Sequence, residues 1–133
     1  MNSSEFLLQF DGASKGNPGP SGCGATIIYQ NKEIAFCYEK LGIQTNNYAE
    51  YSGLLIGLRK ANELGITNII VQGDSKLIIN QLNGSFTVKS QNLANLYNDC
   101  MALSQSFENI TFQHIYRNAN SRADELANLG CNI

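Results

Sequence analysis

The order of strand-like and helix-like segments constrains this 133-residue chain more than any other feature. Short apolar runs predict strands at Glu5–Phe10, Cys23–Gln30, Glu33–Leu41, Asn68–Gln72 and Ile110–Arg117. Apolar residues at helical spacing predict helices at Asn47–Leu64, Lys76–Leu82, Asn92–Ser106 and Ser121–Leu129. Three strands joined by tight turns favour an antiparallel start, and later strands that alternate with helices favour parallel additions. The order therefore predicts an α/β fold with a mixed five-stranded sheet flanked by helices.

Composition indicates one ordinary globular domain over residues 1–133, with 43% hydrophobic and 15% charged residues. No apolar run approaches the roughly 18 residues that a membrane span requires, and the first residues lack the basic and apolar segments of a signal peptide. We therefore expect a cytoplasmic monomer. The net charge of −2 gives no support to nucleic-acid binding, so metal ions and local groups would have to offset that deficit.

The acidic residues fall at the ends of predicted elements. Asp11 ends the first strand and Asp74 the fourth, and each has a glutamine two positions earlier on the same face of its strand. Glu50 and Asp124 fall in the first turns of two predicted helices. If these four carboxylates converge, protons or cations must neutralise them. Hard divalent ions with oxygen ligands do so in two-metal phosphoryl transfer.

Each acid also has a structural interpretation. Asp11-Gly12 fits a turn, and Asp74-Ser75 fits the N-cap of a helix. Glu50 and Asp124 suit first turns because the helix macrodipole favours negative charge there by about 0.3–1 kcal/mol each. The sequence alone does not show that the four carboxylates converge. Two interpretations therefore stay open at this point, a metal site and four separate structural carboxylates.

Four motifs resemble those of the type 1 ribonuclease H family, in the right order and over nearly the whole chain. They are Asp11-Gly-Ala-Ser-Lys-Gly-Asn-Pro-Gly-Pro-Ser-Gly22, Thr45-Asn46-Asn47-Tyr48-Ala49-Glu50, Gly73-Asp74-Ser75 and Asn120-Ser-Arg-Ala-Asp124-Glu-Leu-Ala127. One such motif is weak evidence, whereas four with matching spacing are specific. The resemblance implies a ribonuclease H-like fold in the short form of the family.

The resemblance also implies an activity and its residues. It implies an endoribonuclease that cleaves the RNA strand of RNA–DNA hybrids by two-metal-ion hydrolysis, leaving 5′-phosphate and 3′-hydroxyl ends. Asp11 would bridge two Mg²⁺ ions, for which Mn²⁺ is a substitute. Glu50 and Asp74 would hold the ion at the leaving group, and Asp124 the ion that activates the attacking water.

Contacts to the hybrid follow from the same resemblance. Asn17, Asn46 and Asn47 match residues that reach the minor groove and the RNA 2′-hydroxyls. Thr45 matches a contact to a DNA phosphate. Structural alternatives stay open here too, because Asn17-Pro18-Gly19 fits a turn and Asn46 or Asn47 fits the N-cap of the long helix. Asn120 fits the N-cap of the last helix in the same way.

Two family features are missing from the sequence. The loop before Asp124 lacks the histidine of many members, and Arg117 is its nearest substitute, as a phosphate contact or as a surface residue. The only histidine, His114, fits a strand residue with a satisfied hydrogen bond. The segment Asn83–Asn92 carries one cation, Lys89, in place of a basic protrusion. We therefore expect lower and less salt-sensitive affinity for a hybrid.

Two other functions compete with the nuclease hypothesis. A catalytically weak or inactive ribonuclease H-like domain that binds nucleic acid fits the acidic balance and the missing features. The four acids argue against it, because a pure binder has no use for clustered carboxylates. An unrelated nucleotide-binding domain would fit the glycine-rich first loop. However, that loop is neither GxGxxG nor GxxxxGKS/T, and a strand follows it where those folds place a helix.

Overall fold

The computed structural model describes residues 5–133, so the signal-peptide prediction lies largely outside the described residues. Its elements are, in chain order, β1 Phe6–Ser14, β2 Gly19–Tyr29, β3 Lys32–Gln44, α1 Asn46–Glu63, β4 Asn68–Gly73, α2 Lys76–Leu82, α3 Gln91–Ser104, β5 Asn109–His114, a 3₁₀-helix Arg117–Ala119, and α4 Ser121–Cys131. The predicted order of strands and α-helices is confirmed. Within this range, none of the helices is both long and apolar enough to cross a bilayer.

The sheet has the strand order β3-β2-β1-β4-β5. β1 pairs antiparallel with β2, and β2 with β3, whereas β4 pairs parallel with both β1 and β5. The predicted mixed sheet, with an antiparallel start and parallel additions, is confirmed. Gln9 lies opposite Gln72 in the β1–β4 register, and its Nε2 donates to Gln72 Oε1 at 2.9 Å. The C-terminal end of β4 therefore lies beside the middle of β1, next to Phe10 and Asp11.

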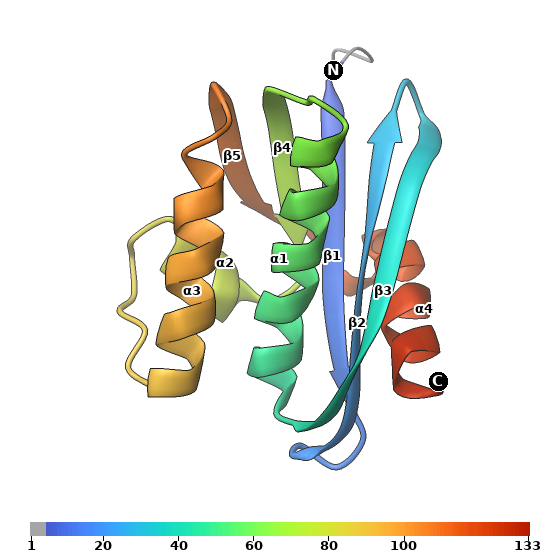
Figure 1. Cartoon of the computed structure of the whole chain (residues 1–133), viewed down its shortest axis with the longest axis vertical. Helices are drawn as coiled ribbons and strands as arrows, with labels where there is room; N and C mark the ends of the chain where they lie inside the picture. The colour runs from blue at the N-terminus through green and yellow to red at the C-terminus, as the bar shows by residue number, and fades with distance from the viewer. Residues whose placement is uncertain (1–4) are drawn as a thin grey trace.

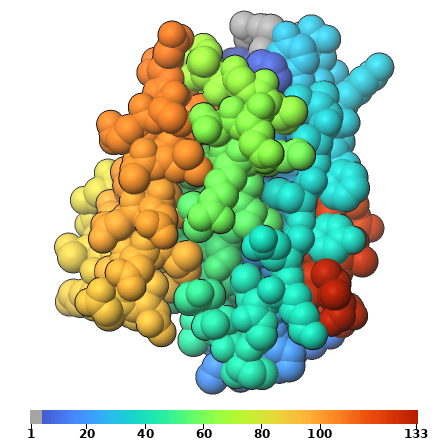
Figure 2. Space-filling view, viewed as in Figure 1, coloured from blue at the N-terminus to red at the C-terminus, as the bar shows by residue number. Residues whose placement is uncertain are grey.

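Helices cover both faces of the sheet. α1 and α3 lie on one face and α4 on the opposite one (Figure 1). On the first face α3, α1 and β3 lie side by side at the surface (Figure 2). The core fills the space between the sheet and α1, and its largest buried side chains include Leu8, Phe10, Ile27, Tyr51, Leu54 and Leu58. Burial of each such side chain contributes about 1.5–3 kcal/mol, which holds α1 firmly against β1.

The ends of α1 show one confirmed and one wrong prediction. The glycine after the predicted helix, Gly65, is typical of a C-terminal stop, and it has a φ of +76° while the amides of Gly65 and Ile66 donate to the carbonyls of Asn62 and Ala61. At the other end the N-cap is Thr45, whose Oγ1 accepts from the Tyr48 amide at 3.2 Å. The prediction that Asn46 or Asn47 caps the helix is wrong. Both asparagines lie inside the first turn, because the helix begins at Asn46.

Several predicted boundaries also need correction. β1, β2 and β3 run further than their apolar patterns, because they pair across the hairpins through polar and glycine residues. β5 ends at His114 and not at Arg117. Its neighbour β4 ends at Gly73, and the Ile115 amide makes the last bond, to the Gly73 carbonyl at 2.9 Å. α3 ends at Ser104, and α4 continues to Cys131.

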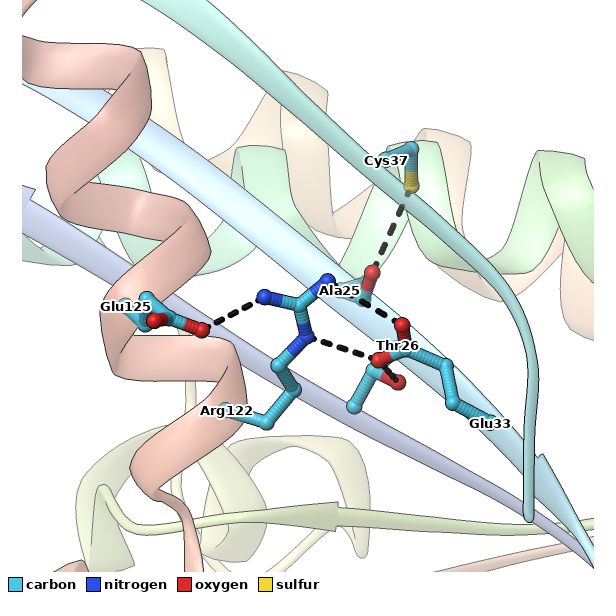
Figure 3. Close-up of polar contacts among 6 residues, drawn as sticks. All are labelled: Ala25, Thr26, Glu33, Cys37, Arg122 and Glu125. Atoms are coloured by element: carbon cyan, nitrogen blue, oxygen red, sulfur yellow. Dashed lines mark hydrogen bonds and ion pairs between the residues drawn. The ribbon is translucent and has the colours of Figure 1, made fainter.

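A polar network fixes α4 to the sheet (Figure 3). Arg122 of α4 makes a two-pronged contact with Glu33 of β3, through Nε to Oε2 at 2.7 Å and through Nη2 to Oε1 at 3.0 Å. Thr26 of β2 donates to the same carboxylate at 2.6 Å, and the Arg122 guanidinium lies 5.1 Å from the centre of the Phe36 ring. Arg122 lowers the pKa of Glu33 below its usual value. These contacts fix the rotation of the helix that carries Asp124.

Candidate metal centre

Three of the four predicted acids lie together. Asp11 is inside β1, Glu50 is in α1 and Asp74 follows β4, and one carboxylate oxygen of each lies within 4.8 Å of those of the other two. Asp11 and Glu50 are buried, whereas Asp74 is half-buried. Residues more than 60 positions apart in the sequence therefore form one group, which the sequence alone left open.

The fold explains this convergence. β1 and β4 are parallel neighbours, so Asp11 and Asp74, each two residues after the paired Gln9 and Gln72, lie side by side where β4 ends. α1 crosses the end of β1, and Glu50 lies one turn into the helix because the helix begins at Asn46. The prediction of Glu50 in the first turn is therefore wrong. The effect of the helix macrodipole falls off within the first turn. It therefore explains a buried carboxylate in the second turn less well than it would explain one in the first.

Asp124 lies beside this group but outside its closest contacts. It is in the first turn of α4, as predicted, and its amide donates to the Asn120 carbonyl at 3.1 Å. It lines a cavity of about 530 Å³ together with Asp11 and Asp74, and its charge raises the pKa of Asp11. All four acids thus lie around one site, with Asp11, Glu50 and Asp74 at its centre.

The electrostatics of the group favour bound protons or cations. Burial raises the pKa of Asp11 to about 7, and the negative charge of Asp74 adds to the shift. Burial and the charge of Asp11 raise the pKa of Glu50 well above its usual value. Glu50 Oε2 is buried without a hydrogen-bond partner among residues 5–133. A buried acceptor without a partner is costly, so this oxygen is available to a proton or to a metal ion.

These pKa shifts predict how stability depends on pH. The unfolded chain releases the protons of these two carboxyl groups near pH 4, whereas the folded chain keeps them on Asp11 and Glu50 to higher pH. Above about pH 4 the folded state therefore binds more protons than the unfolded state. In metal-free buffer the free energy of unfolding should therefore fall as pH rises from about 5 to about 7. Each pKa unit corresponds to about 1.4 kcal/mol. Urea unfolding with a chelator at several pH values measures this, and a flat or rising profile would contradict it.

Sequence reasoning missed the role of Asn120. The residue precedes α4 as predicted, but its side chain makes no capping bond. It is fully buried, and its Nδ2 donates to the Phe10 carbonyl at 3.0 Å and to Asp74 Oδ2 at 3.2 Å. An asparagine before a helix is typical of an N-cap, so the local pattern gave no signal of this long-range contact.

Four of the five predicted substrate residues line a second cavity, of about 520 Å³. Asn17, Thr45, Asn46 and Asn47 contribute to it, and the start of α3 adds residues that the sequence did not indicate, among them Ser90 and Asn92. The backbone amide of Asn46 donates to Asn17 Oδ1 at 2.9 Å, which ties the first loop to the start of α1. Asn46 lines both cavities. A polar surface therefore connects the acids with the asparagines.

Arg117 and His114 lie near Asp74. Arg117, in the 3₁₀-helix, is exposed and lines the cavity that contains Asp11, Asp74 and Asp124. His114 is the last residue of β5, and its Nε2 lies 3.3 Å from the Asp74 backbone carbonyl. Its ring also packs edge-on against Tyr116. These contacts agree with the prediction that His114 is a strand residue whose hydrogen bond is satisfied.

Comparison with known proteins places this arrangement in a family. A family model described as reverse transcriptase-like matches residues 9–130. The chain is 40% identical over 126 residues to the bifunctional protein Rv2228c of Mycobacterium tuberculosis, which covers 93% of this chain and 35% of that protein. The chain thus spans about a third of the length of this relative.

Solved structures are similar over almost the whole chain. RNase H1 from the archaeon Halobacterium salinarum aligns with a TM-score of 0.92 and 33% identity, covering 96% of this chain and 98% of that one. LC11-RNase H1 in complex with an RNA/DNA hybrid aligns with a TM-score of 0.91 and 30% identity, covering 96% and 97%. The likeness therefore includes the strands and helices that carry the acids.

Proposed function

The chain belongs to the reverse transcriptase-like family of ribonuclease H domains, and from this premise we propose that it is a metal-dependent endoribonuclease that cleaves the RNA strand of RNA–DNA hybrids. The observation that carries the proposal is the group of three carboxylates, Asp11, Glu50 and Asp74, beside a polar surface. The solved complex of the similar LC11-RNase H1 with an RNA/DNA hybrid supports the substrate. The products would carry 5′-phosphate and 3′-hydroxyl ends.

The donor set fits divalent cations. It consists of carboxylate oxygens, which Mg²⁺ prefers and Mn²⁺ accepts. One of them is Glu50 Oε2, which has no hydrogen-bond partner in the described part of the chain. Asp11, Glu50, Asp74 and Asp124 would hold two Mg²⁺ ions, or Mn²⁺ as a substitute. Such ions, when bound, activate a water molecule and stabilise the charge that develops on the scissile phosphate. The chain itself supplies the fixed, largely buried ligands, which need no reorganisation during the reaction.

The residues around the acids would bind the hybrid. Asn17, Asn46 and Asn47 offer amide groups that can hydrogen-bond RNA 2′-hydroxyls, the groups that distinguish RNA from DNA. Thr45 Oγ1 is engaged as the cap of α1, so a phosphate contact by Thr45 would have to share this hydroxyl or use its backbone. Arg117 is the cation best placed to contact a phosphate near the acids, and it would offset part of the net charge of −2. We further propose a monomer that acts in the cytoplasm, in keeping with four unpaired cysteines.

The test is a cleavage assay with strand-labelled substrates. With Mg²⁺ or Mn²⁺, we expect cuts in the RNA strand of a hybrid and none in single-stranded RNA, double-stranded RNA or duplex DNA. A chelator should stop the reaction, and a phosphatase-sensitive 5′ end should identify the products. A chain that bound the hybrid and the metal but left the RNA intact would instead support the non-catalytic alternative.

A further inference from the structure

A single buried side chain connects three of the segments that carry the acids. Asn120 Nδ2 donates to the carbonyl of Phe10, the residue before Asp11, and to Asp74 Oδ2. The Asn120 carbonyl accepts from the Asp124 amide. The middle of β1, the residue after β4 and the start of α4 therefore meet at Asn120, which is 0% exposed.

We propose that Asn120 is a positioning residue, which fixes the Asp74 carboxylate and the start of α4 relative to Asp11 so that the site binds metal ions. The inference rests on the function proposed above. Asn120 is not a catalytic residue in this scheme, because it acts through Asp74 and the β1 backbone. Nδ2 has two N–H groups and two acceptors, the Phe10 carbonyl on β1 and Asp74 Oδ2 just after β4.

The identity of the residue supports this role over a capping role. Serine, threonine and aspartate also cap helices well, but none of them offers two N–H donors from one atom. Asn120 Oδ1 is moreover buried without a hydrogen-bond partner among residues 5–133. A buried acceptor of this kind is unfavourable, and a residue that served packing alone would be apolar. The two donor bonds of Nδ2 are therefore what asparagine provides here.

The bond to Asp74 Oδ2 has a specific consequence. It holds one oxygen of a half-buried carboxylate that would otherwise rotate, and it leaves Asp74 Oδ1 unengaged by this amide. Removing a group that hydrogen-bonds to a metal ligand and orients it typically lowers metal affinity by about 10–100-fold. Loss of the Asn120 amide should therefore weaken metal binding by about that factor, even where the chain remains folded.

The experiment measures Mn²⁺ binding by calorimetry, without substrate, for the wild type and Asn120→Ala. We expect the Mn²⁺ dissociation constant to rise about 10–100-fold. In the cleavage assay, the Mn²⁺ concentration for half-maximal rate should rise in parallel, and the rate should largely recover at saturating Mn²⁺. Asn120→Asp, which keeps the shape of the side chain but removes both donors, covers the case in which the alanine variant does not fold. Circular dichroism checks the fold of each variant.

A double-mutant cycle shows whether Asn120 acts through Asp74. In an Asp74→Asn background, Asn120→Ala should add little further loss of Mn²⁺ affinity, because the oriented carboxylate is already gone. Asn83→Ala is the matched control. Its exposed amide also donates to a strand carbonyl, that of Phe112 at 3.2 Å, but it does not line the acid cavity. This control should leave Mn²⁺ affinity unchanged.

The outcomes separate this inference from the proposed function. A wild type that binds Mn²⁺ and cleaves the hybrid, with folded Asn120 variants of unchanged Mn²⁺ affinity, would overturn the positioning role and leave the nuclease standing. A lower melting temperature with unchanged affinity would likewise assign Asn120 a purely structural role. A wild type that bound no Mn²⁺ would overturn both.

Discussion

Replacing Asp11 by asparagine is expected to abolish cleavage of the RNA–DNA hybrid and to leave the chain folded. Asp11 is the buried centre of the acid group, and its carboxylate lies within 4.8 Å of those of both Glu50 and Asp74. An amide keeps the size of the side chain but removes the negative charge that a shared metal ligand supplies. We expect the rate to fall by about a thousandfold, the upper end of the scale of losing one preorganised electrostatic contact to the transition state. The strand-labelled cleavage assay measures this loss.

The same substitution should stabilise the metal-free protein. Burial raises the pKa of Asp11 to about 7, so at pH 8 the folded chain carries an unfavourable buried charge. Asp11→Asn removes that charge and should raise the free energy of unfolding at pH 8 by about 1–4 kcal/mol. It should also flatten part of the decrease in stability between pH 5 and pH 7. Urea unfolding with a chelator measures both effects.

Asp99→Asn is the matched control for these effects. Asp99 is exposed on α3, so the same chemical change there should alter neither the cleavage rate nor the free energy of unfolding appreciably. Full cleavage by Asp11→Asn would show that the acid group is not the reaction centre. Lost cleavage together with an unfolded chain would show that Asp11 serves the fold.

The sequence predicted the elements well because their signals are local. Apolar runs and helical spacing act over a few residues, and the resulting order of elements predicted a mixed five-stranded sheet. The strand order, in which β4 pairs with β1, came only from the structure. Even so, the strands extend beyond their apolar patterns. Residues such as Ala13 and Ser14 belong to β1 because β2 pairs with them, and nothing in their own side chains indicates a strand.

The sequence predicted those site residues that lie near the ends of predicted strands and helices. Asp11 and Asp74 were predicted at the ends of strands, and parallel pairing of β1 with β4 brings them together although β1 continues past Asp11. The depth of Glu50, by contrast, depends on where α1 begins. Thr45 caps that helix, although either following asparagine is an equally good capping residue. Asn120 illustrates the limit most clearly. Its partners are 110 and 46 positions away in the sequence, so only the folded chain reveals what its amide does.

Gly12 lies in close contact with the backbone of α1, and Gly12→Ala should have the second large effect. A Cβ at this position would lie 2.2 Å from the backbone carbon of Ala49 and 2.3 Å from the backbone nitrogen of Glu50. Neither atom belongs to a flexible side chain, so α1 must move away from β1. Forcing atoms into a packed core costs about 1–3 kcal/mol and sometimes more. We expect a loss of at least about 3 kcal/mol in the free energy of unfolding, measured with urea.

The same movement should also reduce cleavage, because Gly12 follows Asp11 and the displaced backbone carries Glu50. A misplacement of about 1 Å can cost about a hundredfold in rate, so even the folded fraction of Gly12→Ala should cleave slowly. Gly42→Ala is the control. Its Cβ would meet nothing within 4 Å, but its φ of +73° makes alanine unfavourable by about 1–2 kcal/mol. A Gly12→Ala variant no less stable than this control, with normal cleavage, would mean that the close contact between β1 and α1 does not set the spacing of Asp11 and Glu50.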